Sequence, residues 1–342
     1  MVEITEKSLL ILIPTAVLLD LWVGDPTWSP HPVVIMGSLI KVLQEYVEKF
    51  SEDKKHLLRF GGLLLTTTLI LFSGISGWLI ERLALPGSII PIYLGQILVL
   101  VGLSSGLAAR SLYEGVIAVL KKIPELDEIS DLNPARERLG KIVGRDVSGL
   151  NKEDILRATA ETASENAVDG IFAPLFWMFI GLYSWHISLE LPGPLSFVWI
   201  YKAVSTIDSM VGYRRGKLLW LGTAGARLED IMTWLPCRIV VITLPIVSKP
   251  LRKYFYVIKK SIKEGSKDLS PNSGLSEAIF AYCADVRMGG QNRYKGNYIE
   301  KPLLAKNSPQ AGIRSIKKIL RMIFHLEITW LAIYFLSLTC MP

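Results

Sequence analysis

Apolar residues gather in long runs along this chain, and polar residues gather between them. Residues 60–80 and 88–108 each form a run of about twenty residues that is nearly free of charge, long enough for a helix to cross roughly 30 Å of hydrocarbon. Further runs that are shorter or interrupted by polar residues lie at 9–23, 171–189, 195–211 and 322–340. Because almost no segment alternates apolar and polar residues with a period of two, little sheet is expected. The pattern predicts an all-α, polytopic helical membrane protein with cytoplasmic helical segments.

The charge content supports this prediction. Charged residues make up only 20% of the 342 residues, compared with about a quarter in soluble domains. Basic residues crowd the segments at 41–59, 110–157, 214–227 and 249–318. Under the positive-inside rule these segments lie in the cytoplasm, so topology explains the net charge of +7 and there is no reason to expect a nucleic-acid partner. The soluble parts are then two cytoplasmic blocks, about 110–169 and 249–320, within a single membrane domain over 1–342.

The segment 231–247 does not fit a simple alternation of sides, because basic sequence flanks both of its ends and Arg238 lies inside it. We predict a re-entrant or interfacial helix there. The first apolar run is not followed by a small-residue cleavage site, so it is expected to remain in the mature protein. Cys237, Cys283 and Cys340 show neither metal-site spacing nor a disulfide pattern.

An acidic helix is predicted to begin at Asn151, a good N-cap, and to run into apolar sequence. At 100° per residue, one stripe of this helix carries Asp154, Arg157, Glu161, Glu165 and Asp169. Carboxylates one turn apart repel each other, and a bound cation or a cationic partner would relieve that repulsion. We therefore predict that Glu161, Glu165 and Asp169 hold Mg²⁺ or orient a cationic amine. The alternative is a solvated face in which Arg157 pairs with Glu161.

Two further constellations place ionisable residues beside apolar sequence. Lys202 and Asp208 lie in the run at 195–211, where charge is costly and usually marks a polar path or site. Snorkelling by the lysine and a helix-end role for the aspartate are the alternatives. Arg227 and Asp230 share a helix face, and an arginine held by an aspartate is a preorganised fork for a carboxylate or phosphate. An ordinary structural ion pair is the alternative for this second constellation.

A third constellation has the features of an anion site. Asn272, Ser273 and Gly274 form a hydroxyl- and amide-rich turn that opens a helix, where free N–H groups and the helix dipole favour anions. Arg287 precedes Gly289-Gly290, a pair that would let backbone amides approach a phosphate. Glycine pairs also commonly end helices, and we expect this pair to end a helix over 275–286.

His31 is held between Pro30 and Pro32, which makes it either a catalytic candidate or a buried turn residue. The sequence contains no G-x-x-x-x-G-K-[ST], so a nucleotide would not be held by a Walker loop. G-x-S-x-G, H-E-x-x-H and G-x-G-x-x-G are also absent.

Nine blocks occur in order along nearly the whole chain: D-L-W-V-G-D-P from Asp20, P-H-P-V-V from Pro30, I-V-G-R-D-V from Ile142, E-T-A-S-E-N-A-V-D-G-I-F-A-P-L-F-W from Glu161, Y-K-A-V-S-T-I-D-S-M-V-G-Y-R from Tyr201, A-R-L-E-D from Ala226, S-P-N-S-G from Ser270, V-R-M-G-G from Val286 and E-K-P from Glu300. Each block is weak alone, but the ordered set is highly specific. The chain resembles the adenosylcobinamide-phosphate synthases, the CbiB/CobD family of cobalamin biosynthesis. Glu229 is a minor departure, since aspartate is common there in the family.

The resemblance implies an integral membrane ligase with its active site facing the cytoplasm. It would join (R)-1-amino-2-propanol O-phosphate to the propionate carboxylate of adenosylcobyric acid, the corrinoid substrate, using ATP and Mg²⁺. Ethanolamine phosphate is an open alternative, because one methyl group separates the two amines. A small-solute transporter whose path is lined by Lys202, Asp208 and Arg238, and a membrane scaffold for other cobalamin-assembly enzymes, are the alternative functions.

Residue roles can be set beside this chemistry as hypotheses. Glu161, Glu165 and Asp169 would supply the metal site or the base that deprotonates the amine. The cofactor would be bound by Asn166, Arg227, Asp230, Asn272, Ser273, Gly274 and Arg287. Among these, Arg227, Arg287 and the turn at 272–274 would take the phosphates, with Arg227 held by Asp230. Lys202 and Asp208 would position the carboxylate or the amine, and His31 is a further catalytic candidate.

Overall fold

The computed structural model describes residues 6–24, 31–124, 131–213, 215–294 and 296–339. The all-α prediction is confirmed, since helices dominate and the described strands form one two-stranded hairpin. The chain divides into two compact units, 1–108 with 173–233 and 334–342, and 109–172 with 234–333. Asp25 and Pro26 of the first sequence block, and Cys340, lie outside the described residues.

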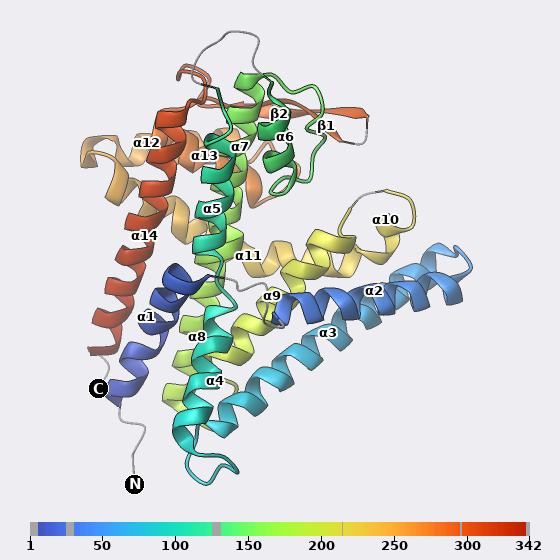
Figure 1. Ribbon diagram of the computed structural model, residues 1–342, viewed down its shortest axis with the longest axis vertical. Helices are drawn as coiled ribbons and strands as arrows, with labels where there is room; N and C mark the ends of the chain where they lie inside the picture. The colour runs from blue at the N-terminus through green and yellow to red at the C-terminus, as the bar shows by residue number, and fades with distance from the viewer. Residues whose placement is uncertain (1–5, 25–30, 125–130, 214, 295, 340–342) are drawn as a thin grey trace. The chain divides into compact units, whose positions relative to one another are not determined.

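The first unit is built from helices that carry most of the apolar runs (Figure 1). Its elements are α1 (Glu6–Val23), α2 (Pro32–Ser51), α3 (Lys55–Leu83), α4 (Ile92–Ser104), α8 (Ala173–Ile187), α9 (Pro194–Val211), α10 (Leu218–Leu221) and the start of α11 (Thr223–Ser248). Small residues let α3 approach α9 closely, because a Cβ on Gly77 would lie 2.7 Å from Ser196 Cα. Ser196 Oγ donates to Gly74 O at 2.8 Å across the same contact. Small residues at such interfaces are typical of membrane helix pairs.

The second unit holds the acidic helix and the hairpin (Figure 1). Its elements are α5 (Ala109–Leu120), α6 (Asn133–Gly140), α7 (Lys152–Ala167), η1 (Val168–Phe172), the rest of α11, η2 (Leu251–Lys253), α12 (Tyr254–Gly265), α13 (Ser273–Ala284), β1 (Met288–Tyr294), β2 (Asn297–Leu304) and most of α14 (Ile313–Thr339). Helix α7 is buried along most of its length, and Ser276 Oγ of α13 donates to Ser164 O at 2.7 Å. Its many alanines and threonines therefore serve close packing.

Among the described residues, five helical segments are long and apolar enough to cross a membrane, so this is a multi-pass membrane protein. They are Lys55–Leu83, Ile92–Leu120, Lys152–Ile187, Thr223–Ser248 and Ile313–Ser337, with Ile11–Val23 as a shorter apolar helix. The predicted spans at 60–80, 88–108, 171–189 and 322–340 overlap four of these segments. The run at 195–211 forms helix α9 but is not among the five.

Residues 231–247 form part of one continuous helix, α11, although Pro236 and Pro245 lie inside it. This helix is long and apolar enough to cross a membrane, and the re-entrant or interfacial placement of 231–247 stays a prediction. A proline in a helix lacks one donor but does not force the chain to turn back.

The hairpin was not predicted from the sequence. The helix expected over 275–286 is α13, and it ends earlier, at Ala284, with Asp285 in a left-handed conformation (φ 57°) as its C-cap. Gly289 and Gly290 do not end a helix; they belong to β1, at φ 84° and 98°. A register irregularity between Met288 and Gly290 accompanies these angles, as is typical of a glycine bulge in an antiparallel pair.

Candidate functional site

A buried carboxylate lies at the centre of the candidate site in the second unit. Glu161 of α7 has no exposed surface, and its two oxygens accept from Arg145 Nη2 at 2.6 Å, from Gly289 N at 2.8 Å and from Arg157 Nη1 at 3.3 Å. Burying a carboxylate is costly unless it is paired and hydrogen-bonded, and here it is both. The alternative interpretation of this helix expected a pair between Arg157 and Glu161. The pair is present, but it lies inside the protein and not on a solvated face.

The hairpin and α7 are joined through the same arginines. Asn292 Oδ1 of β1 accepts from Arg145 Nη1 at 2.6 Å and from Arg157 Nη1 at 3.0 Å. Arg157 also donates to Gly289 O and Gln291 O, both at 2.9 Å. An arginine presents several donors in a fixed plane, which suits it to tie two elements together in this way. The Nδ2 of Asn292 is buried and lacks a hydrogen-bond partner among the described residues.

A second buried ion pair lies next to the first. Lys301 Nζ of β2 contacts Glu277 Oε1 of α13 at 2.7 Å and Asp268 Oδ2 at 3.7 Å. Burial alone would lower the pKa of Lys301, but the attraction of Glu277, Glu165 and Asp268 outweighs burial and raises it. Lys301 therefore stays positively charged.

Glu277 behaves differently from an ordinary glutamate. Burial, together with the nearby charges of Glu161 and Glu165, raises its pKa to about 8 although Lys301 opposes the change. Its Oε2 atom is buried and has no hydrogen-bond partner among the described residues. The carboxylate of Glu165 is half-buried and makes neither a hydrogen bond nor an ion pair with a described residue. Glu165 and Glu277 thus each have a carboxyl oxygen free to accept a hydrogen bond, and both are attracted by the positive charge of Lys301.

The predicted metal ligands do not converge. Among the described residues, no group of three or more histidine, cysteine, aspartate or glutamate side chains is placed to hold a metal ion. Glu161 is already taken by Arg145 and Arg157, while Asp169 lies in the π-helical turn η1 that follows α7. The set Glu161, Glu165 and Asp169 therefore does not fit as a protein cage for Mg²⁺.

The predicted anion turn is largely used by the protein itself. Ser270 Oγ accepts from Asn272 N at 3.3 Å and from Ser273 N at 3.2 Å, and Asn272 Oδ1 accepts from Arg238 Nη1 at 2.6 Å. Gly274 packs against α12, since a Cβ there would lie 2.4 Å from Gly265 O. This turn fastens α13 through its backbone N–H groups, the side-chain amide of Asn272 and the close approach at Gly274.

The other anion candidates in the second unit have side chains with fewer contacts to the rest of the protein. Arg287 is half-buried and donates its backbone N–H to Pro309 O at 2.8 Å, and it forms no ion pair with a described residue. Asn166 is also half-buried, and its side chain makes no hydrogen bond to the described chain. These two side chains keep their donors available, so their assignment to phosphates stays a prediction.

Four candidates of the first unit lie on its helices α9 and α11. Lys202 and Asp208 are half-buried on α9, and Arg227 and Asp230 lie on the first turns of α11. Arg227 forms no ion pair with any described residue, so the expected fork with Asp230 is not made. Their roles toward a substrate stay predictions.

His31 has a clear structural role. It is the N-cap of α2, and its Nδ1 accepts from Val33 N at 3.3 Å. The flanking Pro32 occupies the first helical position, where a proline is favoured because it lacks a donor that the helix would leave unpaired. This cap corresponds to the turn interpretation of His31, and its catalytic assignment is not tested by the geometry.

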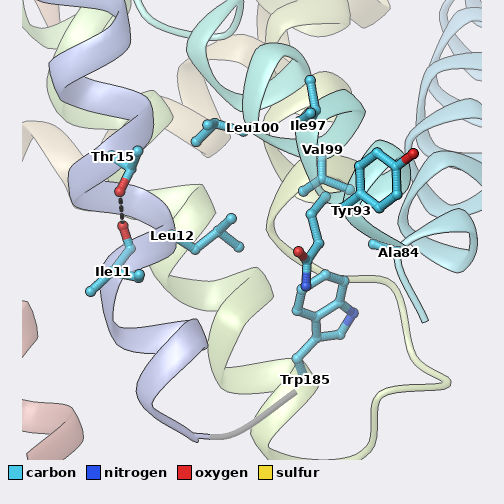
Figure 2. Close-up of a pocket in the computed structure, with 10 residues that line it drawn as sticks. Ile11, Leu12, Thr15, Ala84, Tyr93, Ile97, Val99, Leu100 and Trp185 are labelled. Atoms are coloured by element: carbon cyan, nitrogen blue, oxygen red, sulfur yellow. Dashed lines mark hydrogen bonds between the residues drawn. The ribbon is translucent and has the colours of Figure 1, made fainter. Parts of the chain in front are cut away.

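The first unit also contains an apolar pocket of about 330 Å³ between α1, α4 and α8 (Figure 2). Leu12, Ile97 and Trp185 line it, and Thr15 Oγ1 donates to Ile11 O at 2.6 Å on its α1 side. Within the described part of the chain, no charged side chain lines the pocket. It is therefore unsuited to phosphates or carboxylates.

Three residues of the site were missed as functional candidates from the sequence. Arg145 and Lys301 stand in the quoted blocks that begin at Ile142 and Glu300, and Glu277 directly follows Ser276 after the predicted anion turn. Their positions in the sequence gave no sign that they meet. Arg145 directly follows Gly144 and Lys301 directly precedes Pro302, and a charged residue beside glycine or proline is a signal that could have drawn attention to these two; Glu277 has no such neighbour.

The fold and the site define a multi-pass helical membrane protein with a buried cluster of carboxylates and basic groups. Residues 13–323 match the family model described as CobD/Cbib protein. The chain is 38% identical over 294 residues to "Cobalamin biosynthesis protein CobD" of Synechocystis sp., covering 86% of this chain and 81% of that protein. It is 34% identical to the protein of the same name from Clostridium acetobutylicum, covering 93% and 95% of the two chains. No solved structure matches. The chain belongs to the CobD/CbiB family.

Proposed function

We propose that this protein is an ATP-dependent amide ligase of cobalamin biosynthesis, an adenosylcobinamide-phosphate synthase. It joins (R)-1-amino-2-propanol O-phosphate, or ethanolamine phosphate, to the propionate carboxylate of adenosylcobyric acid. Membership of the CobD/CbiB family supports the pathway. The observation that carries the reaction class is the pair of underused carboxyl groups, Glu165 and Glu277, beside the Lys301 ammonium.

The chemistry of amide formation calls for such a site. A carboxylate does not react with amines at neutral pH, so ATP first converts it to an acyl phosphate, with ADP as the leaving group. The amine nitrogen then attacks the carbonyl carbon and expels phosphate, and a base takes the proton that the ammonium group loses. Stabilising charge that develops in these steps is the main task of the protein.

Glu277 and Glu165 fit the amine side of this reaction. A substrate ammonium that reaches Glu165 meets an unpaired carboxylate, and Glu277, whose pKa is raised to about 8, holds protons with an affinity suited to a base near neutral pH. Lys301 supplies a fixed positive charge for the carboxylate or phosphate that the amine attacks. Mg²⁺ would accompany ATP, bound mainly by phosphate oxygens and water. Because 110–169 and 249–320 are rich in basic residues, we place the site on the cytoplasmic side.

The direct test is product formation by the purified, detergent-solubilised protein. It is incubated with adenosylcobyric acid, aminopropanol phosphate, ATP and Mg²⁺, and adenosylcobinamide phosphate is sought by mass spectrometry. We expect product that disappears when ATP or Mg²⁺ is omitted, and a competition between the two amines shows which is preferred. Absence of product from folded protein would contradict the ligase and favour a scaffold or a transporter.

A matched pair of variants tests the residues. Glu165→Gln should abolish turnover with the fold unchanged, because the ammonium loses its unpaired carboxylate. Glu153→Gln is the control, since Glu153 lies on the same helix and is exposed. Wild-type rates in Glu165→Gln would overturn the assignment, whereas a loss in both variants would show that the assay reports stability.

A further inference from the structure

A surface that combines basic and aromatic side chains follows directly after α11. That helix is long and apolar enough to cross a membrane and ends at Ser248. Pro250 then caps the short helix η2, and α12 begins at Tyr254. The sequence from Lys249 to Lys263 contains no acidic residue. All of these residues except the start of α11 belong to the second unit.

Helix α12 turns its only acidic side chain inward. Glu264 accepts from Tyr282 Oη at 2.7 Å and from Ala305 N at 2.9 Å. The buried positions Val257, Ser261 and Gly265 form the face that packs within the unit. The acidic side chain of α12 is therefore hydrogen-bonded within the unit, and the charged residues on the opposite face are all basic.

That opposite face continues onto the preceding helix η2. Together the two form what we call the α12 face, which consists of Arg252 and Lys253 of η2 and Phe255, Lys259, Ile262 and Lys263 of α12, all exposed. Phe255 is 81% exposed and Ile262 is 48% exposed. None of the four basic residues forms an ion pair within the described part of the chain. Lys249 differs from these four residues, because it forms an ion pair with Asp285 Oδ2 at 2.5 Å within the unit.

Exposed aromatic side chains mixed with unpaired cations are characteristic of helices that lie in a membrane interface. The ring enters the boundary between headgroups and acyl chains, while lysine side chains extend their charge toward the headgroups. The connection to α11 is only a few residues long, so a bilayer crossed by α11 has its headgroup region close to the start of α12. Anionic lipids attract such juxtamembrane basic segments.

We propose that the α12 face binds the headgroups of anionic phospholipids at the membrane surface where α11 ends. Phosphate oxygens pair with Lys253, Lys259 and Lys263, and Phe255 enters the interface beside them. The inference stands apart from the ligase activity, because none of these residues belongs to the candidate site.

Lipid retention tests the proposal without any substrate. The full-length protein is purified in detergent with equal amounts of phosphatidylglycerol and phosphatidylcholine, and the lipids that remain bound are quantified by mass spectrometry. We expect phosphatidylglycerol to exceed phosphatidylcholine. The triple variant Lys253→Gln, Lys259→Gln, Lys263→Gln should lower that ratio by up to about fivefold per lysine, the equivalent of roughly 1 kcal/mol for each basic residue near an anionic surface.

The matched control replaces two exposed lysines of the same unit that lie outside the α12 face, Lys141→Gln with Lys306→Gln. It should keep the wild-type lipid ratio. Raising the ionic strength should lower the ratio for the wild-type protein, a measurement that needs no variant. Equal retention of the two lipids by the wild-type protein, an unchanged ratio in the triple variant, or an equal loss in the control would each overturn the proposal.

Discussion

Arg145 and Glu161 form an ion pair that is almost closed to solvent. Arg145 Nη2 lies 2.6 Å from Glu161 Oε2, and the two side chains are 7% and 0% exposed. Burial works against the charge of Arg145, but the attraction of Glu161 outweighs it and raises the pKa of the guanidinium above its usual value. This pair fixes the loop before α7 against α7, and through Asn292 it fixes the hairpin as well.

Removing Glu161 should destabilise the second unit strongly. Glu161→Ala leaves Arg145 and Arg157 buried without their carboxylate, and breaking a buried pair on one side costs about 3–5 kcal/mol. Thermal unfolding in detergent measures the effect as a lower melting temperature. Glu137→Ala is the control, because its pair with Lys141 at 3.2 Å is exposed and exposed pairs contribute less than about 1 kcal/mol. Equal melting temperatures for the two variants would contradict the buried role of Glu161.

Glu277 should make the stability of the protein depend on pH. Its pKa is raised from 4.5 to about 8 in the folded chain. A carboxyl that binds its proton more tightly when folded stabilises the fold fully below pH 4.5, and this contribution is lost as the pH rises to about 8.

The melting temperature followed over that pH range tests this expectation. The wild-type protein should lose more stability than Glu277→Gln, whose amide cannot ionise, and Glu153→Gln should follow the wild-type protein. Parallel curves for the wild-type protein and Glu277→Gln would show that Glu277 does not titrate there.

Gly289 should be intolerant of any side chain. Its φ of 84° favours glycine, and a Cβ would lie 2.0 Å from Pro302 O across the hairpin. Gly296 has a similar φ of 86°, but a Cβ there would meet no described atom within 4 Å, so it separates backbone strain from the clash. Gly296→Ala should cost about 1 kcal/mol for the left-handed conformation, and Gly289→Ala considerably more. Melting temperatures compare the variants, and equal losses would show that the hairpin yields at Gly289.

Features that depend on neighbouring residues could be predicted from the sequence. Asn151 caps α7 as expected, with its Oδ1 accepting from Asp154 N at 2.8 Å, because an N-cap involves residues only a turn apart. The long apolar helices follow from length and composition alone. The Arg157–Glu161 contact was the alternative to the predicted metal site, and residues four apart on a helix are neighbours, although the pair is buried and not on a solvated face.

Features that depend on residues far apart in the sequence could not be predicted from it. The acidic stripe invites a metal-site interpretation, because nothing near it in the sequence shows that Arg145 and Gly289 close around Glu161. The same limit applies to Lys301 and Glu277, which meet only once β2 lies beside α13. By local preference Gly289 would end a helix. Only the folded structure shows that it is a strand residue, so close to Pro302 O that a side chain would clash there.

Glu81 should hold the start of α9 in the first unit. Gly193 is the N-cap of α9 but offers no side chain, and Glu81 of α3 takes that role from a distance. Its Oε2 accepts from Gly193 N at 2.8 Å, and its Oε1 accepts from Leu195 N at 2.7 Å and Ser196 N at 3.2 Å. The first N–H groups of a helix have no partner within the helix itself.

Glu81→Ala therefore leaves three buried donors unpaired and should cost at least about 1–3 kcal/mol, the penalty for one such group. Glu81→Gln should fall between this variant and the wild-type protein, because its amide oxygen still accepts while its NH₂ group faces another donor. Glu45→Ala is the control, since Glu45 is exposed on α2 in the same unit. Melting temperatures rank the variants, and limited proteolysis of the segment at 188–193 should rise in the same order. If that segment stays as resistant in Glu81→Ala as in the wild-type protein, the carboxylate does not anchor α9.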